Sequence, residues 1–398
     1  MREDKLAKTV FFIASPFLTL PAILYGIYNK SKYSTMLLAG IFGLISYLYV
    51  PRISNDRARY FEYYELFSNY NFENFLYFLA QGRPDFLLHY LIFVFAKLNI
   101  PIQLLFLLIT GFTVGVFLRI FIKISEQNQS KNSHFFVGFG LIILSLSLPD
   151  LLSGLRFYLA SSFVVLAFFK GLMDNRLIYG MIFLVLATTI HFSSLIYFPI
   201  FLILLKFPNK DILYRYIFLG SFLFLFIPKD FIISFLDLFN FTGAYSQKVN
   251  LYLQQEDLIQ RGIKEGSSNY YLVYLFSVLW SYFAYLYLIF SIKRKSLLRN
   301  IIYLCFTVVN IFFVVPDVYS RYLILISFLF CMLLISERHY YKNAKNIFIA
   351  LSLFSLNFIS SIIILRDNLY ISLFNNYSLS LIFVFFKKIS PLDFLSLS

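Results

Sequence analysis

Two segments of the sequence place a side chain suited to phosphate or proton chemistry at the edge of an apolar run. In "LSGLRFYLASSFVVLAFF", Arg156 follows Gly154 and begins a predicted helix with small residues on its next turn. A guanidinium there can donate two parallel hydrogen bonds to a phosphate. In "LATTIHFSSLIYFPIFL", His191 lies between two apolar runs. Its imidazole could act as a general base or, when charged, donate a hydrogen bond to a phosphate.

Both side chains also have a purely structural interpretation. Arg156 could be an interfacial arginine that extends to lipid headgroups, and His191 could cap the end of a helix. A third segment, "VVPDVYSRYLILISF", brings Asp317, Tyr319 and Arg321 into one short loop before a helix. Here Asp317 and Arg321 could simply pair with each other.

Two polar segments add further candidates. "VPRISNDRARYFEYYELF" holds Arg52, Asp56, Arg57 and Tyr60, although a solvated amphipathic helix with paired charges has the same composition. The loop "NFTGAYSQKVNLYLQQEDLIQRGIKEGSSN" contains Tyr245 and is rich in Gln, Tyr and Asn. Aromatic rings and amides bind sugars by stacking and hydrogen bonds, but they also suit any solvated loop.

The composition indicates which elements must position these residues. Of the 398 residues, 60% are hydrophobic and 14% are charged, whereas about a quarter are charged in soluble domains. The apolar runs are continuous, and in lipid only helices or closed barrels satisfy the backbone. We therefore expect an all-α, polytopic membrane bundle, with residues 1–398 as one transmembrane domain. About fourteen runs are typical of spanning helices: 9–28, 34–50, 86–99, 102–124, 135–148, 156–172, 177–190, 192–206, 215–236, 270–292, 301–315, 322–336, 347–365 and 369–386.

The distribution of basic residues predicts an orientation. One alternate set of loops carries 14 of them: Lys123, Lys131, Lys170, Arg176, Lys206, Lys210, Arg215, Lys293, Lys295, Arg294, Arg299, Arg338, Lys342 and Lys345. By the positive-inside rule these loops are cytoplasmic, so Arg156, His191, Arg321 and the long loop 237–269 lie at the outer face. The polar segment 51–85 is typical of an interfacial segment, and its side of the membrane stays open.

Charge and missing motifs narrow the classes of function. The formal net charge of +14 suits both anionic headgroups and a pyrophosphate-bearing ligand. Cys305 and Cys331 lie in apolar runs, where a thiol behaves as a small hydrophobic group, so we expect no disulfide framework. The sequence has no phosphate-binding loop, zinc-protease or nucleophile-elbow motif. We expect no metal, no cofactor and no nucleic-acid partner.

In chain order, these segments resemble the EpsG-like group of Wzy-type O-antigen and exopolysaccharide polymerases. The resemblance begins with Arg52, Asp56 and Tyr60 after the second span and continues with "RPDFLLHYLIFVFAKLNIPIQLLF". The Arg156 and His191 segments then follow, and a late "SRY" completes it. The chain departs from the family pattern in two places. Phe157 stands where a glutamine often follows the arginine, and Ser54-Asn55 precede Asp56 in place of Gly-Thr.

The resemblance implies a glycosyltransferase similar to the C class (GT-C), which takes lipid-linked sugar from the outer leaflet. It would join undecaprenyl-pyrophosphate-linked repeat units at the periplasmic face of the bacterial inner membrane, in contact with membrane lipids and a polysaccharide chain-length regulator. The implied roles are catalysis by His191, with Asp56 or Asp317 as the competing base; pyrophosphate binding by Arg156, Arg321 and Arg52; and glycan binding by Tyr60, Tyr319 and Tyr245.

Two other functions share this architecture. A lipid-linked-oligosaccharide flippase is a transporter with a similar number of spans, but transporters tend toward internal repeats and charges near the midplane. No internal repeat is evident, and the unusual polar groups gather at the predicted outer ends of spans, which favours the polymerase. An O-antigen ligase differs in its acceptor, the lipid A core, which the sequence does not reveal.

Overall fold

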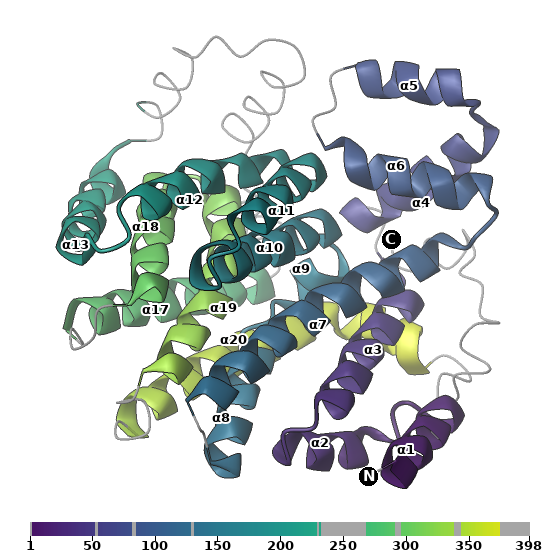
Figure 1. Ribbon diagram of the computed structural model, residues 1–398. Coiled ribbons are helices and arrows are strands. Elements are labelled where there is room, and N and C mark those ends of the chain that lie inside the picture. The colour runs from purple at the N-terminus through teal and green to yellow at the C-terminus, as the bar shows by residue number, and fades with distance from the viewer. Residues whose placement is uncertain are drawn as a thin grey trace.

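A computed structural model describes residues 2–51, 55–81, 85–128, 131–228, 231, 268–290, 296–337 and 344–374. Within these ranges every regular element is helical (Figure 1). The first half contains α1 Arg2–Ala14, α2 Leu20–Tyr28, α3 Lys32–Leu48, α4 Asp56–Asn69, α5 Phe72–Ala80, α6 Phe86–Lys97, α7 Ile102–Gln127, α8 Asn132–Leu144, α9 Leu148–Leu152 and α10 Leu155–Leu166. The second contains α11 Leu177–Ile190, α12 Tyr197–Lys206, α13 Asp211–Gly220, α17 Ser268–Phe290, α18 Leu297–Ile311, α19 Pro316–Ser336 and α20 Ala344–Leu369.

Short irregular helical segments extend several of these helices. A π-helical segment, Ala167–Met173, continues α10, and another, Tyr370–Phe374, continues α20. A 3-10 segment, Phe192–Ile196, leads into α12, and Ser221–Phe226 follows α13. The predicted start of the last helix, 369–386, is therefore wrong, because residues 369–374 continue the helix that contains 347–365. Residues 375–386 lie outside the described residues.

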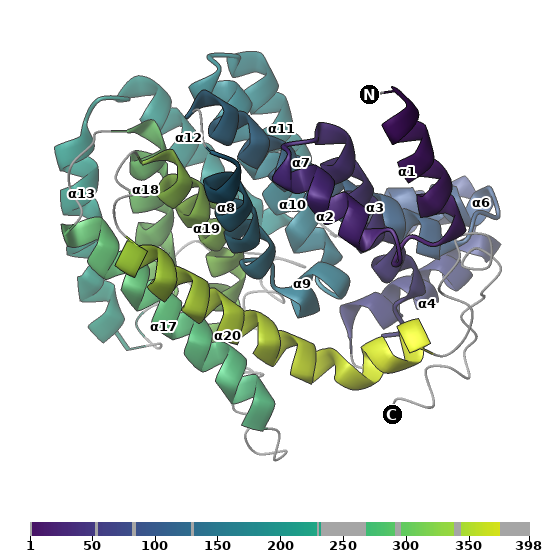
Figure 2. The same ribbon diagram turned by 90° about the horizontal axis from the view of Figure 1, so that it is seen from below.

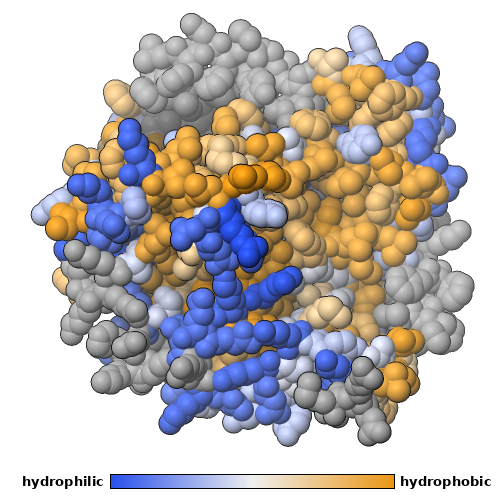
Figure 3. All heavy atoms as spheres, viewed as in Figure 1, coloured by the Kyte–Doolittle hydropathy of each residue, from blue (hydrophilic) through white to orange (hydrophobic). Residues whose placement is uncertain are grey.

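By length and composition, five helices in the described part of the chain can cross a membrane. They are Ile102–Gln127, Leu155–Met173, Tyr271–Phe290, Val318–Ser336 and Lys345–Leu373, and shorter apolar helices accompany them. On the face drawn in Figure 3, hydrophobic side chains cover much of α6, α7, α11 and α12, and hydrophilic residues gather near the ends of α7 and α8. The chain is a helical membrane protein, as its composition predicts.

Small residues bring the central helices close together. α3 packs along α7, and a Cβ added at Gly43 would come within 2.9 Å of the carbonyl oxygen of Leu107. The π-helical continuation of α10 meets α11 in the same way, since a Cβ at Gly171 would lie 2.8 Å from the Cα of Gly180. Helices in membranes commonly pack through such close backbone approach. α19 lies in the middle of the bundle, in contact with α7, α8, α10, α17 and α18 (Figures 1 and 2).

One predicted helix is divided into two, and the polar segment 51–85 contains two further helices. The predicted single helix 9–28 is wrong, because residues 15–19 separate α1 from α2. Pro16 lies in this break, and a proline ring removes a backbone donor and clashes with the preceding turn. The polar segment 51–85 contains α4 and α5, and an Asn71 side chain that accepts from the backbone of Asn74 caps α5.

Basic residues from separate predicted cytoplasmic loops converge at one end of the bundle. Lys123 at the end of α7 and Lys170 after α10 both pair with Asp174, the second at 3.2 Å. Arg299 at the start of α18 pairs with Glu337 just after α19. We call this the basic end.

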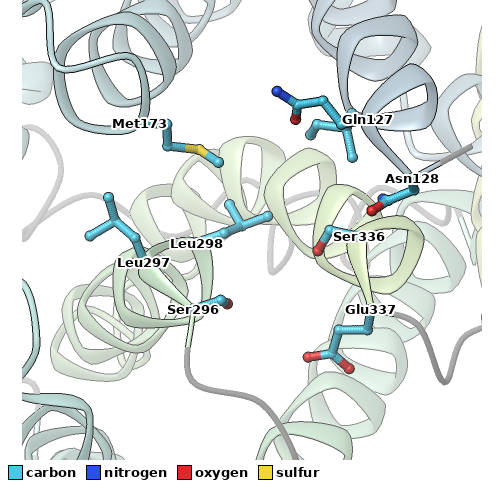
Figure 4. A pocket seen from close by; sticks show the side chains of 9 residues that line it. Gln127, Asn128, Met173, Ser296, Leu297, Leu298, Ser336 and Glu337 are labelled. Atoms are coloured by element: carbon cyan, nitrogen blue, oxygen red, sulfur yellow. The ribbon is translucent and has the colours of Figure 1, made fainter.

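A cavity of about 220 Å³ opens at the basic end (Figure 4). It is lined by Ile124, Gln127, Asn128, Met173, Ser296, Leu297, Leu298, Ser336 and Glu337. None of the residues predicted to do chemistry lines it. The long loop 237–269 lies, apart from the first residues of α17, outside the described residues.

Candidate active site

Arg156 is held at the start of α10 by a tight connection from α9. Gly154 forms this connection, and a Cβ there would lie 3.0 Å from the carbonyl oxygen of Asp150. The side chain of Ser147, just before α9, donates a hydrogen bond to the Asp150 carboxylate, and its backbone N–H donates to Tyr158 at 2.7 Å. This local structure fixes the direction in which Arg156 leaves its helix. The Arg156 side chain is 23% exposed.

The main partner of Arg156 is Asp85, the residue immediately before α6. Arg156 Nη1 lies 3.1 Å from Asp85 Oδ2, and the Asp85 side chain is only 2% exposed. The other carboxylate oxygen accepts a hydrogen bond from the backbone N–H of Phe192 at 2.8 Å. His89, one turn into α6, donates from Nδ1 to the Asp85 carbonyl oxygen at 2.8 Å. Asp85 is therefore anchored through both its carboxylate and its backbone.

His191 lies beside the same carboxylate, at the break between α11 and the segment leading to α12. Its Nδ1 is 3.9 Å from Asp85 Oδ1, within ion-pair range but longer than a hydrogen bond. The ring meets Phe157 edge to face, with 5.5 Å between centroids. Asp85 thus joins Arg156 to the turn that carries His191.

The start of α4 supplies a second carboxylate to Arg156. Asp56 Oδ2 lies 3.6 Å from Arg156 Nη2, and Asp56 also pairs with Arg59 one turn along α4. The Arg156 guanidinium sits 5.8 Å from the centre of the Tyr60 ring. Asp56 and Tyr60 are four residues apart, so both face Arg156 from one side of α4.

Arg321 and Asp150 complete the cluster. The Arg321 charge interacts with Asp56, Asp150 and His191, and Asp150 in turn interacts with Asp56. Tyr322, the next residue on α19, donates from its hydroxyl to the backbone carbonyl of Ser193 at 3.2 Å, which ties α19 to the His191 turn. We call Asp56, Tyr60, Asp85, Asp150, Arg156, His191 and Arg321 the arginine–aspartate cluster.

Burial and neighbouring charges separate the pKa values of these groups. Burial lowers the pKa of His191, against the attraction of Asp85, so the imidazole is neutral at pH 7. Burial alone would raise the pKa of Asp56, but Arg156, Arg59 and Arg321 together hold it below its usual value. Burial raises the pKa of Asp150 and raises that of Tyr60 to about 12. The cluster thus combines charged guanidinium groups with a neutral imidazole, which suits anion binding beside proton transfer.

The cluster lies at the helix ends opposite the basic end. α10 begins at Leu155, next to Arg156, and its π-helical continuation reaches the basic end at Met173. α19 likewise begins near Arg321 and ends at Ser336, beside the Arg299–Glu337 pair. α4 contributes Asp56 to the cluster, so the segment 55–81 lies on the side of Arg156 and away from the basic loops.

The structure brings together five of the predicted site residues and separates another. Asp56, Tyr60, Arg156, His191 and Arg321 belong to the cluster. Tyr319 is fully buried elsewhere; its hydroxyl pairs with Ser281 at 2.8 Å and its ring packs on Phe313. Asp317 lies in the first turn of α19. Arg52 and Tyr245 lie outside the described residues.

Sequence reasoning missed Asp85 and Asp150. Asp85 stands directly before an apolar helix, in the segment "RPDFLLHY", and an acid at the margin of a span is itself a signal of function. Asp150 follows Pro149 in the connection before Arg156. In the part of the chain that the structure describes, no group of three or more His, Cys, Asp or Glu side chains is arranged to hold a metal ion.

The model of the EpsG family matches residues 50–379, a range that contains the whole arginine–aspartate cluster. No curated protein and no solved structure matches the chain.

Proposed function

The chain belongs to the EpsG family, and from that premise we propose that it is an O-antigen polymerase. It joins oligosaccharide repeat units carried on undecaprenyl pyrophosphate. The observation that carries this proposal is the Arg156 guanidinium, held beside a neutral histidine by one buried carboxylate.

In the proposed reaction, the bond between the anomeric carbon of the growing glycan and its lipid pyrophosphate breaks. A new bond forms to a hydroxyl of the incoming repeat unit, and the hydroxyl proton passes to a base. Negative charge grows on the departing pyrophosphate, where Arg156 and Arg321 can stabilise it. Fixed donors of this kind act most strongly where water is excluded.

His191 is the base in this proposal. Its Nδ1 is the nitrogen nearest the Asp85 carboxylate, which leaves Nε2 to accept the proton. Asp85 then stabilises the imidazolium that forms, as a carboxylate does in other aspartate–histidine pairs. Asp150 is the carboxylate best placed to act as the base in place of His191, because burial raises its pKa.

Pyrophosphate binding requires Arg156 to exchange partners. Asp56 is the carboxylate that can yield, because it is 30% exposed, lies 3.6 Å from Arg156 and already pairs with Arg59. Asp85 is buried and anchored by the Phe192 N–H, so it stays in place. The incoming pyrophosphate thus replaces Asp56 and leaves the Asp85–His191 geometry unchanged. Tyr60, beside Arg156, is placed to contact the first sugar, and Tyr245 stays a proposed glycan contact. Tyr319 is fully buried away from the cluster and is not part of this proposal.

The side of the membrane follows from charge. The basic end collects lysines and arginines from several loops, and such loops stay in the cytoplasm. The arginine–aspartate cluster at the opposite helix ends is then periplasmic, in a bacterial inner membrane. Membrane spans beyond the five that the described helices support, and the similarity to C-class glycosyltransferases, belong to the same proposal.

Purified protein in lipid nanodiscs tests this function directly. Incubation with undecaprenyl-pyrophosphate-linked repeat units should give a ladder of lipid-linked polymers and release undecaprenyl pyrophosphate, without a second protein. Transport of the substrate across liposomes without any ladder would instead identify a flippase. Transfer that occurs only when lipid A core is added would identify a ligase.

A further inference from the structure

Arg57 is the largest side chain that the structure buries completely, with 0% exposed. It lies between Asp56 and Ala58 in the first turn of α4, a segment whose composition is equally compatible with a functional site and with a solvated amphipathic helix. Burying a charge is costly unless it is paired and hydrogen-bonded. Among the described residues no carboxylate pairs with Arg57, so the reason for its burial must lie in its neutral contacts.

Those contacts join α4 to three other helices. Arg57 Nη1 donates to the hydroxyl of Ser46 on α3 at 3.1 Å and to the carbonyl of Leu152 at 2.9 Å, and Nη2 donates to the carbonyl of Ser46. The guanidinium also lies 4.2 Å from the centre of the Phe106 ring on α7. Ser46 is itself tied to α7 by a 2.9 Å hydrogen bond from Thr110.

The Leu152 contact connects the two halves of the arginine–aspartate cluster. Leu152 is the last residue of α9, and carbonyls at a helix end lack partners within the helix. Arg57 satisfies this carbonyl and places its positive charge at the helix end that favours it. One side chain therefore couples α4, which carries Asp56 and Tyr60, to α9, which carries Asp150 and leads to Arg156.

We propose that Arg57 is a positioning residue of the active site: it locks the rotation of α4 so that Asp56 and Tyr60 face Arg156. Asp56 and Tyr60 lie four residues apart on one helix face, and Arg57 leaves the helix about 100° away from Asp56. Turning α4 about its axis would move both side chains away from Arg156 and break all the Arg57 contacts at once. This role rests on the proposed function for its effect on catalysis, but not for its effect on helix position.

Cysteine labelling measures the position of α4 without any enzyme assay. Ala58 is 6% exposed and the two native thiols, Cys305 and Cys331, are fully buried, so Ala58→Cys should react slowly with a maleimide. We expect Arg57→Met to speed labelling of this cysteine about tenfold through local opening. Arg57→Lys should have a smaller effect, since it keeps the charge but loses the planar fork. Arg59→Met is the matched control, because Arg59 is on the same helix but exposed, and should leave labelling unchanged.

The native cysteines report whether the whole bundle has opened. If Arg57→Met also exposes Cys305 and Cys331, the whole bundle has opened, and the milder Arg57→Lys and Ser46→Ala variants are then compared instead. Faster labelling at position 58, with both native thiols still protected, supports the proposal. Unchanged protection at position 58 in every folded Arg57 variant overturns it. This result holds even if the wild-type protein makes no polymer, so it is independent of the proposed function.

The catalytic consequence is measured by a double-mutant cycle in the nanodisc assay. Arg57→Met should lower polymer formation about a hundredfold, the size of effect that a small misplacement of a site produces. If Arg57 acts through Tyr60, adding Tyr60→Leu should cost much less than it does in the wild-type background. If the loss in the double mutant equals the product of the two single losses, the residues act independently and the positioning role is contradicted. Arg57→Lys should retain part of the activity that Arg57→Met loses.

Discussion

The carboxylate of Asp85 lies 3.1 Å from the guanidinium of Arg156, across 71 residues of sequence. The same carboxylate accepts the N–H of Phe192, next to His191. Removing one partner of a buried ion pair leaves the other charge uncompensated. Asp85 therefore determines both where Arg156 points and where the His191 turn lies, and the proposed chemistry depends on it.

Asp85→Asn should reduce polymer formation strongly while the protein stays folded. The amide keeps the shape of the side chain but removes the negative charge that attracts Arg156 and stabilises a protonated His191. We expect a loss of about a hundredfold or more in turnover, because catalytic groups that act as a unit fail together. The measurement is the rate of ladder formation by purified protein. Wild-type turnover in Asp85→Asn would remove Asp85 from the mechanism.

Asp56→Asn should reduce polymer formation less than Asp85→Asn does. Asp56 is partly exposed and its ion pairs with Arg59 and Arg156 lie near solvent, where such pairs contribute about 0–1 kcal/mol. The free energy of unfolding should therefore stay within about 1 kcal/mol of the wild-type value. If pyrophosphate replaces Asp56, the KM for the lipid-linked donor should not rise. A larger KM would mean that Asp56 binds substrate directly.

The pH dependence of turnover should report His191. A base must be unprotonated, and burial lowers the His191 pKa below its ordinary value of 6.5. Activity should therefore persist at pH 6.5 and fall as the pH drops through the lower pKa of the folded protein. The unfolded chain binds this proton at higher pH, so His191 also lowers the stability of the fold progressively below pH 6.5.

His191→Gln is the matched control for that profile. The residual activity of this variant should not fall at low pH as the wild-type rate does. The loss of stability that protonation of His191 causes at low pH should also be absent. An unchanged acidic limb in His191→Gln would assign the titration to another group, with Asp150 the first candidate.

Close packing of α3 against α7 gives a prediction about stability alone. Gly43→Ala would place a Cβ 2.9 Å from the Leu107 carbonyl oxygen, and backbone cannot move aside easily. We expect a loss of about 1–3 kcal/mol in the free energy of unfolding. Gly140→Ala is the control, since nothing lies within 4 Å of its added Cβ. Thermal unfolding in detergent measures both, and equal unfolding temperatures would contradict the packing.

Much of the helical architecture could be predicted, because continuous apolar runs indicate where helices form. The run 177–190 coincides with α11. The errors occur where hydropathy carries no information about the backbone. Pro16 breaks an apolar run into α1 and α2. No proline or glycine separates the run 347–365 from residues 369–374, which continue the same helix.

The site was predictable only in part. Arg156 and His191 interrupt apolar runs and were evident from residue type. Asp85 was overlooked because its partners are distant in sequence and only the fold brings them together. The sequence left the burial of Arg57 open, since a short polar helix does not reveal which of its charges the bundle buries.

The most direct test of the central claim is a comparison of two lipids that share one tail. Binding of undecaprenyl pyrophosphate and of undecaprenol should be measured for the purified wild-type protein and for Arg156→Gln. Wild-type protein should prefer the pyrophosphate, and the substitution should reduce that preference by about tenfold or more, equivalent to about 1.4 kcal/mol, with undecaprenol binding unchanged. An undiminished preference in Arg156→Gln would contradict the assignment of the pyrophosphate to Arg156.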